Sequence, residues 1–320
     1  MGNRAGGHYR AVMLGGIDIG GTKVSVCRGD ASGRVHAAER FATPEADPAL
    51  VLDECVARLA HFGACNAIGV ACPGPFLAAE GAFLDPPNMP RWHGFELVEQ
   101  LRARVSVPVA AMNDANALAL AEWQWGAGIG VDTMVFFTMS TGMGAGLVID
   151  GKLWQGRRGF AGEVGHWRLA DDGPLGFGKR GSVEGFLSGP GIVQAAEAEA
   201  RICLHNGEST RLIDESLTAE IVCEAATSGD VAARRVTDAC GRRLGQLMAL
   251  LADLLEPELF VLGTIGTAHP DLFIPPALSV IEREALAHVR EDLRVVPSAL
   301  EARGDQSALA VAVRAISRSS

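Results

Sequence analysis

Two glycine-rich loops stand in matching places along the chain, and both have the composition of loops that bind phosphate. Residues 12–28, VMLGGIDIGGTKVSVCR, run from an apolar strand through a glycine loop into a second apolar strand. Residues 134–149, MVFFTMSTGMGAGLVI, repeat this order much later in the chain. Glycine lets a backbone approach a ligand closely and adopt positive φ, so amide N–H groups can point at an anion. The repeat predicts two related lobes that offer their loops to opposite sides of one phosphate chain.

The first loop, DIGGTK, is predicted to bind the phosphates of a nucleotide. It consists of Asp18, Gly20, Gly21, Thr22 and Lys23. Asp18 is placed to hold the water shell of a Mg²⁺ ion. An ordinary hairpin turn is the alternative, because glycine motifs alone are poorly specific. The opposing loop, with the same alternative, is supplied by Thr141, Gly142, Met143 and Gly144.

Asn113 and Asp114 stand where an apolar strand ends. Carboxylates at the C-terminal ends of strands are well placed to act on ligands. The alternative is that Asp114 caps the helix ANALALAEW, which begins at this point. Both interpretations stay open, since one carboxylate oxygen can cap the helix while the other faces the ligand.

Glu163, Gly165 and His166 belong to GFAGEVGHW, which is a glycine-rich loop and not an amphipathic helix. Polar side chains there serve no core, so the pattern favours a ligand role, although a lone histidine is more often a structural hydrogen-bonding group. Glu184 follows GKRGSV and either caps the next helix or reaches back into the site.

The elements that position these residues alternate between strand and helix, which is typical of an α/β domain. Apolar side chains recur at helical spacing over residues 47–62, behind an Asp cap. Further helices are predicted at 184–203, 217–228, 230–255 and 305–318, and a hairpin is predicted at 133–154. We expect a disordered lead over 1–11, an N-terminal lobe over 12–117 completed by the terminal helix at 305–320, and a C-terminal lobe over 118–304.

Composition bounds the class of protein. The length of 320 residues favours about two domains. The formal net charge of −10, without a basic run, argues against nucleic acid or an anionic membrane as partner. No apolar stretch has the length of a spanning helix, and the N-terminus has no signal-peptide core. The seven cysteines form no CxxC pair, which favours buried thiols in a reducing cytoplasm.

Taken together, these motifs resemble the ROK family of sugar kinases and regulators, a branch of the actin-like, ribonuclease H-like kinase superfamily. DIGGTK and STGMGAG match its two phosphate motifs, and NDAN at 113–116 matches its catalytic strand end. The stretch GKLWQGRRGFAGEVGHW is the most specific part, and CPGP at 72–75 and PPNMPRW match sugar-side loops. The resemblance implies an α/β fold of two lobes, built from duplicated βββαβα-type domains around a central cleft. It also implies a homodimer.

The resemblance implies an ATP-dependent kinase that phosphorylates a hexose hydroxyl, and the expected acceptor is the 6-hydroxyl of glucose or a related sugar. Asp114 would be the general base. The sugar hydroxyls would be held by Gly74, Asn88, Asn113, Asp114, Glu163, His166 and Glu184. ATP with Mg²⁺ would contact Asp18, Gly20, Gly21, Thr22, Lys23, Thr141, Gly142 and Gly263.

Two departures from the family pattern have consequences. Where the family carries CxCGxxGCxE, whose cysteines hold zinc with the histidine, this chain reads LGFGKRGSVE, with Leu175, Phe177 and Ser182 at the cysteine positions. A structural zinc site needs about four N or S ligands, so we expect no zinc and predict that apolar packing of Leu175 and Phe177 holds the loop. Thr264, in LGTIG, replaces the second glycine of the adenosine-side pair, which affects the expected nucleotide preference.

Other functions are compatible with the motifs. Within the kinases, the acceptor could be N-acetylmannosamine, N-acetylglucosamine, fructose, or a biosynthetic sugar or cyclitol. A non-catalytic sugar sensor is the alternative of another class, although retention of Asp18 and Asp114 speaks against it. A DNA-binding repressor is not expected, because only a short segment precedes the first strand.

Overall fold

The computed structural model describes residues 12–43, 47–86, 89–213 and 216–319, with the side chains up to residue 317. The chain forms two compact units, and unit 1 comprises the described parts of Met1–Ile129, Leu153–Ala161 and Ala299–Ser320. Unit 2 comprises Gly130–Lys152 and the described parts of Gly162–Ser298. The lobe boundaries expected after residues 117 and 304 remain predictions, and the expected disordered lead lies outside the described residues.

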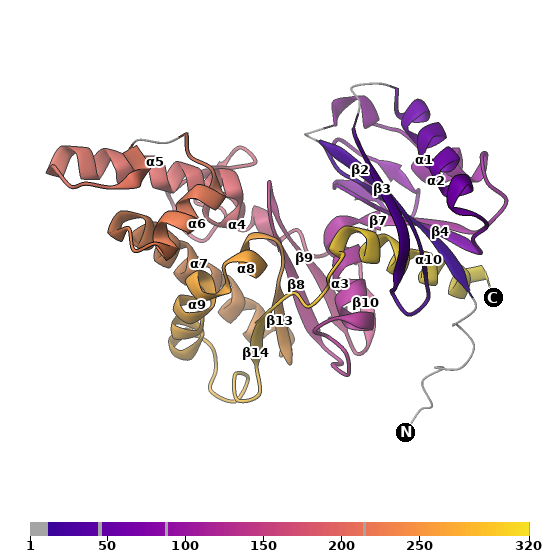
Figure 1. The fold of residues 1–320 in the computed structure, drawn as a ribbon. Helices are drawn as coiled ribbons and strands as arrows, with labels where there is room; N and C mark the ends of the chain where they lie inside the picture. The colour runs from indigo at the N-terminus through magenta and orange to yellow at the C-terminus, as the bar shows by residue number, and fades with distance from the viewer. Residues whose placement is uncertain (1–11, 44–46, 87–88, 214–215, 320) are drawn as a thin grey trace. The chain divides into compact units, whose positions relative to one another are not determined.

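Unit 1 is built on a five-stranded sheet with the order β3-β2-β1-β4-β7 (Figure 1). Its strands are β1 (Met13–Ile19), β2 (Lys23–Asp30), β3 (Val35–Ala42), β4 (Ala67–Cys72) and β7 (Val109–Asn113). The first three run antiparallel, and β4 and β7 continue the sheet parallel to β1. A small hairpin joins β5 (Phe76–Leu77) and β6 (Ala82–Phe83).

Helices cover both faces of this sheet, because side chains alternate along each strand. Ile17 and Ile19 belong to the same buried cluster as residues of α1 (Pro48–Phe62) and α2 (Leu97–Arg102). The predicted cap of α1 is confirmed, since Asp47 accepts a hydrogen bond from the Ala49 amide at 2.9 Å. On the opposite face, Leu14 packs in a cluster with residues of α10 (Arg303–Ser319).

Helix α10 returns from the end of the sequence and lies directly on the sheet of unit 1, where Figure 1 shows it in yellow among indigo and purple elements. Glycine makes this approach possible. A Cβ atom added to Gly69 would lie 2.1 Å from the Ala308 oxygen and 2.2 Å from the Ala312 nitrogen. Helix α3 (Asp114–Trp125) packs beside α10.

A second five-stranded sheet of matching design has the order β10-β9-β8-β13-β14, and all of its residues belong to unit 2 except Leu153 and Trp154 at the end of β10, which belong to unit 1. Its strands are β8 (Met134–Met139), β9 (Met143–Ile149), β10 (Lys152–Trp154), β13 (Leu259–Leu262) and β14 (Arg294–Pro297). As in unit 1, β8 and β9 are antiparallel, whereas β13 and β14 are parallel to β8. The predicted mixed α/β fold with a duplicated strand pattern is therefore confirmed.

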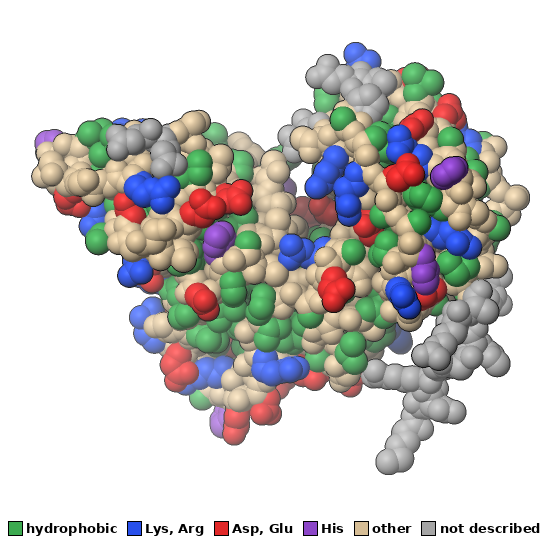
Figure 2. All heavy atoms as spheres, in the orientation of Figure 1, with side chains coloured by type: hydrophobic (Ala, Val, Ile, Leu, Met, Phe, Trp, Pro, Cys, Tyr) green, Lys and Arg blue, Asp and Glu red, His purple; other side chains and the backbone are tan. Residues whose placement is uncertain are grey.

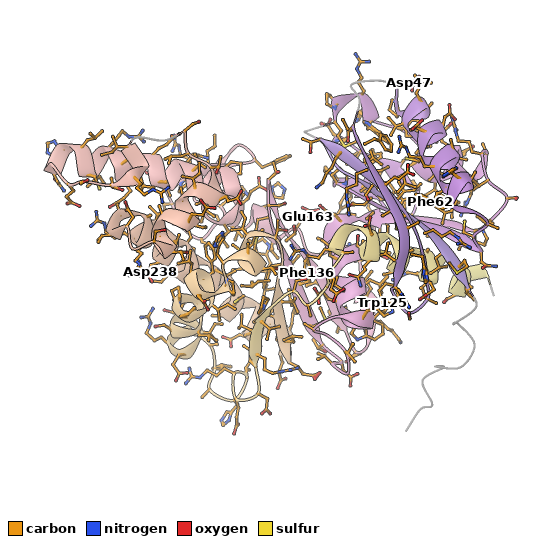
Figure 3. The ribbon with its side chains drawn as sticks, in the orientation of Figure 1. Asp47, Phe62, Trp125, Phe136, Glu163 and Asp238 are labelled. Carbon is orange, nitrogen blue, oxygen red and sulfur yellow. The ribbon has the colours of Figure 1, made fainter. Side chains whose placement is uncertain are left out.

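The described part of unit 2 also contains helices. They are α4 (Val183–Leu187), α5 (Gly189–Asn206), α6 (Ala219–Thr227), α7 (Val231–Leu255), α8 (Ile265–Ala268) and α9 (Pro270–Glu284). Phe136, labelled in Figure 3, is fully buried, and the Phe137 and Phe260 rings lie 5.5 Å apart. The described helices include none that is long and apolar enough to cross a membrane. On the face shown in Figure 2, basic and acidic side chains are interspersed over both units.

Candidate active site

The first glycine loop connects β1 to β2 and is held by backbone contacts. The Gly20 amide donates to the Lys23 oxygen at 2.9 Å, and Thr43 Oγ1 donates to the Gly20 oxygen at 2.6 Å. Gly21, Thr22 and Lys23 are exposed. None of the glycines in either glycine loop is among the positive-φ residues of the described chain. Close approach is the requirement instead: a Cβ on Gly20 would lie 3.0 Å from the Lys23 oxygen.

Asp18 lies near the end of β1, on the face of the sheet that α10 covers. A Cβ on Gly304, in the first turn of α10, would lie 2.1 Å from Asp18 Oδ2, so only glycine leaves room for this carboxylate. Burial raises the pKa of Asp18 from 3.8 to about 6, and the negative charges of Asp114 and Asp305 add to the rise. The positive charges of Lys23 and Arg40 oppose this rise in pKa.

Asp305 also lies in this region, and it is not among the residues predicted from the sequence. It is only 3% exposed, and it accepts hydrogen bonds from Ser25 Oγ at 2.6 Å and from Arg40 Nη2 at 2.9 Å. An acidic residue in the first turn of a helix is ordinary. Its partners lie more than 260 positions away along the chain, so no local signal could identify the contact.

Asn113 and Asp114 lie at the carboxyl edge of the same sheet. Asn113 caps α3 by accepting a hydrogen bond from the Asn116 amide at 3.2 Å. The N-cap considered for Asp114 is therefore provided by Asn113. Asp114 is the first helical residue and accepts a hydrogen bond from the Ala115 amide at 2.7 Å. Burial raises the pKa of the Cys72 thiol, and Asp114 and Asp18 add to the rise. The carboxylates of Asp18 and Asp114 therefore both lie near Cys72, where the parallel strands end.

The second glycine loop connects β8 to β9 in unit 2. Its Ser140 amide donates to the Gly142 oxygen at 3.0 Å, and the Gly189 amide donates to the Ser140 oxygen at 2.7 Å. The Thr141 side chain is exposed.

Glu184 reaches this second loop. Its Oε2 accepts a hydrogen bond from the Met143 amide at 3.2 Å, and a Cβ on Gly142 would lie 3.0 Å from the same oxygen. Helix α4 is capped by Ser182, whose Oγ accepts from the Gly185 amide at 3.1 Å. Of the two interpretations of Glu184, the structure therefore excludes the N-cap and supports the one in which it reaches back.

The loop with Glu163 and His166 lies against β9. A Cβ on Gly162 would lie 2.0 Å from the Ala145 oxygen, and one on Gly165 would lie 2.1 Å from the Met143 oxygen. Glu163, labelled in Figure 3, has its Oε2 3.9 Å from His166 Nε2. Burial raises the pKa of Glu163, and the nearby charge of Glu184 adds to this rise whereas His166 opposes it. Three predicted sugar ligands are thus brought together in unit 2.

The segment at the expected zinc positions forms a hairpin of β11 (Leu175–Gly176) and β12 (Lys179–Arg180). The prediction that apolar packing of Leu175 and Phe177 holds it is wrong, because these side chains are 46% and 56% exposed. Backbone pairing and polar contacts hold it instead. The described residues include no group of three or more His, Cys, Asp or Glu side chains arranged to hold a metal ion. The expected absence of zinc stays a prediction.

Gly263 and Thr264 follow β13. A Cβ on Gly263 would lie 2.5 Å from Phe136 Cζ, so packing alone requires glycine there. Thr264 has φ 45° and ψ −106°, a conformation that favours glycine. Gly74 follows β4 and is joined to Pro75 by a cis peptide bond. Asn88, a predicted sugar ligand, lies outside the described residues.

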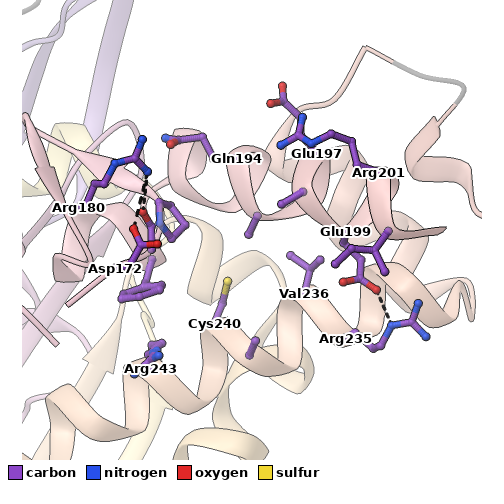
Figure 4. Close-up of a pocket in the computed structure, with 17 residues that line it drawn as sticks. Asp172, Arg180, Gln194, Glu197, Glu199, Arg201, Arg235, Val236, Cys240 and Arg243 are labelled. Atoms are coloured by element: carbon purple, nitrogen blue, oxygen red, sulfur yellow. Dashed lines mark hydrogen bonds and ion pairs between the residues drawn. The ribbon is translucent and has the colours of Figure 1, made fainter. Parts of the chain in front are cut away.

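A separate cavity of about 660 Å³ lies in unit 2 between α5 and α7 (Figure 4). Charged residues at its edge include Arg180 and Asp172, 3.9 Å apart, and Arg235 and Glu199, 2.6 Å apart. None of the predicted site residues lines it. The structure thus brings most of the predicted residues that it describes into two groups, one at the carboxyl edge of the unit 1 sheet and one around β9 in unit 2, whereas Gly263 follows β13.

Comparison with known proteins identifies the family. The sequence profile of the ROK family matches residues 14–313. The chain is similar to an N-acetylmannosamine kinase of Citrobacter koseri, with 33% identity over 301 residues that cover 91% of this chain and 98% of the relative. It is also similar to the solved ROK family glucokinase of Streptomyces griseus in complex with glucose and AMPPNP, at 30% identity and a TM-score of 0.79, covering 95% of this chain and 99% of that one.

A third similar protein is a ROK family transcriptional regulator, a homologue of the Escherichia coli MLC protein. Its solved structure gives a TM-score of 0.87 at 25% identity and covers 96% of this chain and 79% of that chain. These structures confirm the predicted actin-like sugar kinase fold. The chain belongs to the ROK family.

Proposed function

We propose that this chain transfers the terminal phosphoryl group of ATP to a hydroxyl of a hexose, with Asp114 as the general base. Its class, an ATP-dependent sugar kinase, agrees with the prediction and is confirmed by its family and by relatives named as kinases of N-acetylmannosamine and glucose. The observation that carries the proposed role of Asp114 is its position. Asp114 stands at the carboxyl edge of the unit 1 sheet, close enough to Asp18 for its charge to raise the Asp18 pKa.

Phosphoryl transfer depends mostly on positioning and on stabilisation of charge. Asp114 accepts the hydroxyl proton as the new bond to phosphorus forms, a role worth about 10²–10⁴ in rate. Because Asn113 provides the helix cap, the Asp114 carboxylate is held at the first helical position. The amides of the exposed first glycine loop, next to Asp18, bind the phosphates.

Asp18 would hold Mg²⁺ through its water shell. Mg²⁺ prefers oxygen ligands and keeps several waters, so a single carboxylate beside a phosphate chain suits it. The fit is supported by the charge around Asp18, where Asp114 and Asp305 disfavour ionisation and a cation would favour it. When bound with ATP, the ion would offset negative charge on the phosphates.

The sugar side of the site is proposed to include Glu163, His166 and Glu184, together with Gly74, Asn88 and Asn113. Our first candidate for the acceptor is the 6-hydroxyl of glucose or a related sugar. N-Acetylmannosamine is the second candidate, favoured by relatives that are named N-acetylmannosamine kinase and are 31–33% identical to this chain. A sugar-sensing protein without turnover is the candidate of another class, favoured by the likeness to the transcriptional regulator.

We also propose a cellular location and an oligomeric state. All seven cysteines are free, which supports a reducing cytoplasm. We propose a homodimer, without nucleic acid or membrane as partner.

A coupled ADP-release screen over hexoses, amino sugars and cyclitols tests this function. In Asp114→Asn, kcat should fall about 10²–10⁴-fold with the sugar KM little changed, since only the base is removed. Asp292→Asn, at an exposed position, is the control and should retain wild-type rates. Undiminished turnover in Asp114→Asn would remove Asp114 from its role. Binding of ATP without turnover of any sugar would favour the sensor.

A further inference from the structure

Phe177 has a backbone conformation that its residue type disfavours. Its φ is 45°, and the side chain is 56% exposed at the turn of the β11–β12 hairpin. Positive φ is strained for a bulky residue and costs glycine nothing. An exposed ring adds little to folding through burial, so the fold does not explain why this position carries a phenylalanine. Strain of this kind gathers at functional sites.

The Phe177 ring contacts a predicted sugar ligand. It meets the His166 imidazole edge-on, with ring centroids 4.9 Å apart and an interplanar angle of 87°. Such edge-to-face contacts fix the orientation of one ring relative to the other. The His166 side chain is 44% exposed, and the Glu163 carboxylate at 3.9 Å is beyond hydrogen-bond distance. Among the described residues, the ring of Phe177 is thus an aromatic contact that can restrain the imidazole.

The hairpin that carries Phe177 is held by hydrogen bonds to two other segments. The Gln194 side chain on α5 accepts from the Leu175 amide and donates to the Leu175 oxygen, both at 2.9 Å. Lys179 Nζ donates to the His166 carbonyl oxygen at 2.6 Å. The hairpin therefore contacts the loop of Glu163 and His166 through Lys179 as well as through Phe177. These hydrogen bonds keep Phe177 at a fixed place beside the imidazole.

We propose that Phe177 is a positioning residue for sugar binding, holding the His166 imidazole in the orientation that accepts the sugar hydroxyls. This inference rests on the proposed function, in which His166 contacts the acceptor. It assigns a role to the hairpin and gives a reason for the strained backbone at its turn.

Substitutions at Phe177 test whether sugar affinity follows the ring. In Phe177→Ala, KM and Kd for the accepted sugar should rise about 3- to 10-fold, the range of an aromatic pair, with KM for ATP unchanged. Phe177→Tyr retains the ring and should restore wild-type affinity. Leu175→Ala is the matched control, because that side chain is also exposed on the hairpin and Gln194 contacts only its backbone.

Phe177→Gly separates positioning from folding. Glycine accepts the positive φ without strain, so the midpoint of thermal unfolding should stay or rise while sugar affinity falls as in the alanine variant. Wild-type sugar affinity in Phe177→Gly would overturn the inference, and so would an equal loss in Leu175→Ala.

The NMR signals of the His166 ring give a readout that needs no turnover. The ring current of Phe177 should displace the imidazole proton signals, and this displacement should vanish in Phe177→Gly and persist in Leu175→Ala. If the wild-type protein phosphorylates no sugar but shows this displacement, the proposed function fails and the ring contact stands. Unchanged imidazole signals in Phe177→Gly refute the contact itself.

Discussion

At the scale of the residue, neighbouring carboxylates in unit 1 have opposite energetic roles. Asp305 is buried and accepts hydrogen bonds from Ser25 and Arg40, so its charge is compensated. The Asp18 charge is disfavoured by burial and by two nearby carboxylates, as its raised pKa shows. A site that must attract a cation concentrates negative charge at a cost in stability. Asp18 is therefore a residue that the proposed function requires and that the fold disfavours.

Asp18→Asn should stabilise the protein in the absence of Mg²⁺, in a way that depends on pH. Because the folded-state pKa of about 6 exceeds the ordinary 3.8, folding takes up protons between these values, and ionised Asp18 destabilises the native state above about pH 6. The variant should gain at most about 3 kcal/mol at pH 8. This gain should shrink as the pH falls through 6 and vanish below about pH 3, where aspartate is protonated in both states. Urea unfolding at several pH values measures it.

Asp305→Asn is the matched comparison for this prediction. It weakens the acceptor of Ser25 and Arg40, so it should destabilise the protein by about 1–3 kcal/mol at neutral pH. A gain in Asp18→Asn that is the same at pH 4 and pH 8 would contradict the account of Asp18.

The sequence supplied candidate residues for the site but not the contacts that these residues make. Asp114 and Glu184 were each left with two interpretations, and only the structure showed that Asn113 and Ser182 are the caps. Local sequence contains the types of side chain that chemistry needs. Local sequence does not show how exposed each side chain is in the folded protein, which is why the packing expected for Leu175 and Phe177 was wrong.

At the scale of the element, most helices and strands followed from apolar periodicity and caps. Helix α9 did not, and the sequence analysis assigned no element to its residues. Pro275 and Pro276 lie inside it, and proline removes an amide donor and disfavours the preceding turn. The helix persists because its proline packs against α7: a Cβ on Gly241 would lie 2.4 Å from Pro276 Cγ. Tertiary packing between two helices distant in sequence outweighs the local cost.

The start of α8 carries backbone strain that one substitution should relieve. Thr264 caps it at φ 45° and ψ −106°, where a β-branched residue is strained by about 1–3 kcal/mol. Thr264→Gly should therefore raise the free energy of unfolding by about 1 kcal/mol, after the larger entropy of unfolded glycine is subtracted. Thr264→Ala keeps the Cβ and should show no such gain. Equal stabilisation in both variants, measured by chemical unfolding, would refute backbone strain as the cause.

At the scale of the whole molecule, the repeated loop in the sequence reflects a repeated sheet. Each sheet has three antiparallel strands continued by two parallel ones, and its glycine loop connects the first two of these strands along the chain. The sequence showed this duplication because the loops retained their glycines. It did not show the partners of Asp305, because α10 reaches the unit 1 sheet only at the end of the chain.

Removing α10 should therefore unfold unit 1 and leave unit 2 folded. A chain that ends at Ser298 lacks Leu309 and Val311, which are fully buried and contribute about 1.5–3 kcal/mol each, and it uncovers the sheet around Gly69. Such losses approach the total stability of a domain, about 5–15 kcal/mol. Hydrogen exchange should show lost amide protection in β1 and β4 and retained protection in β8 and β13. A chain that ends at Ser317 keeps the buried face of α10 and should be protected throughout. Protection of β1 and β4 in the shorter chain would show that unit 1 folds without this helix.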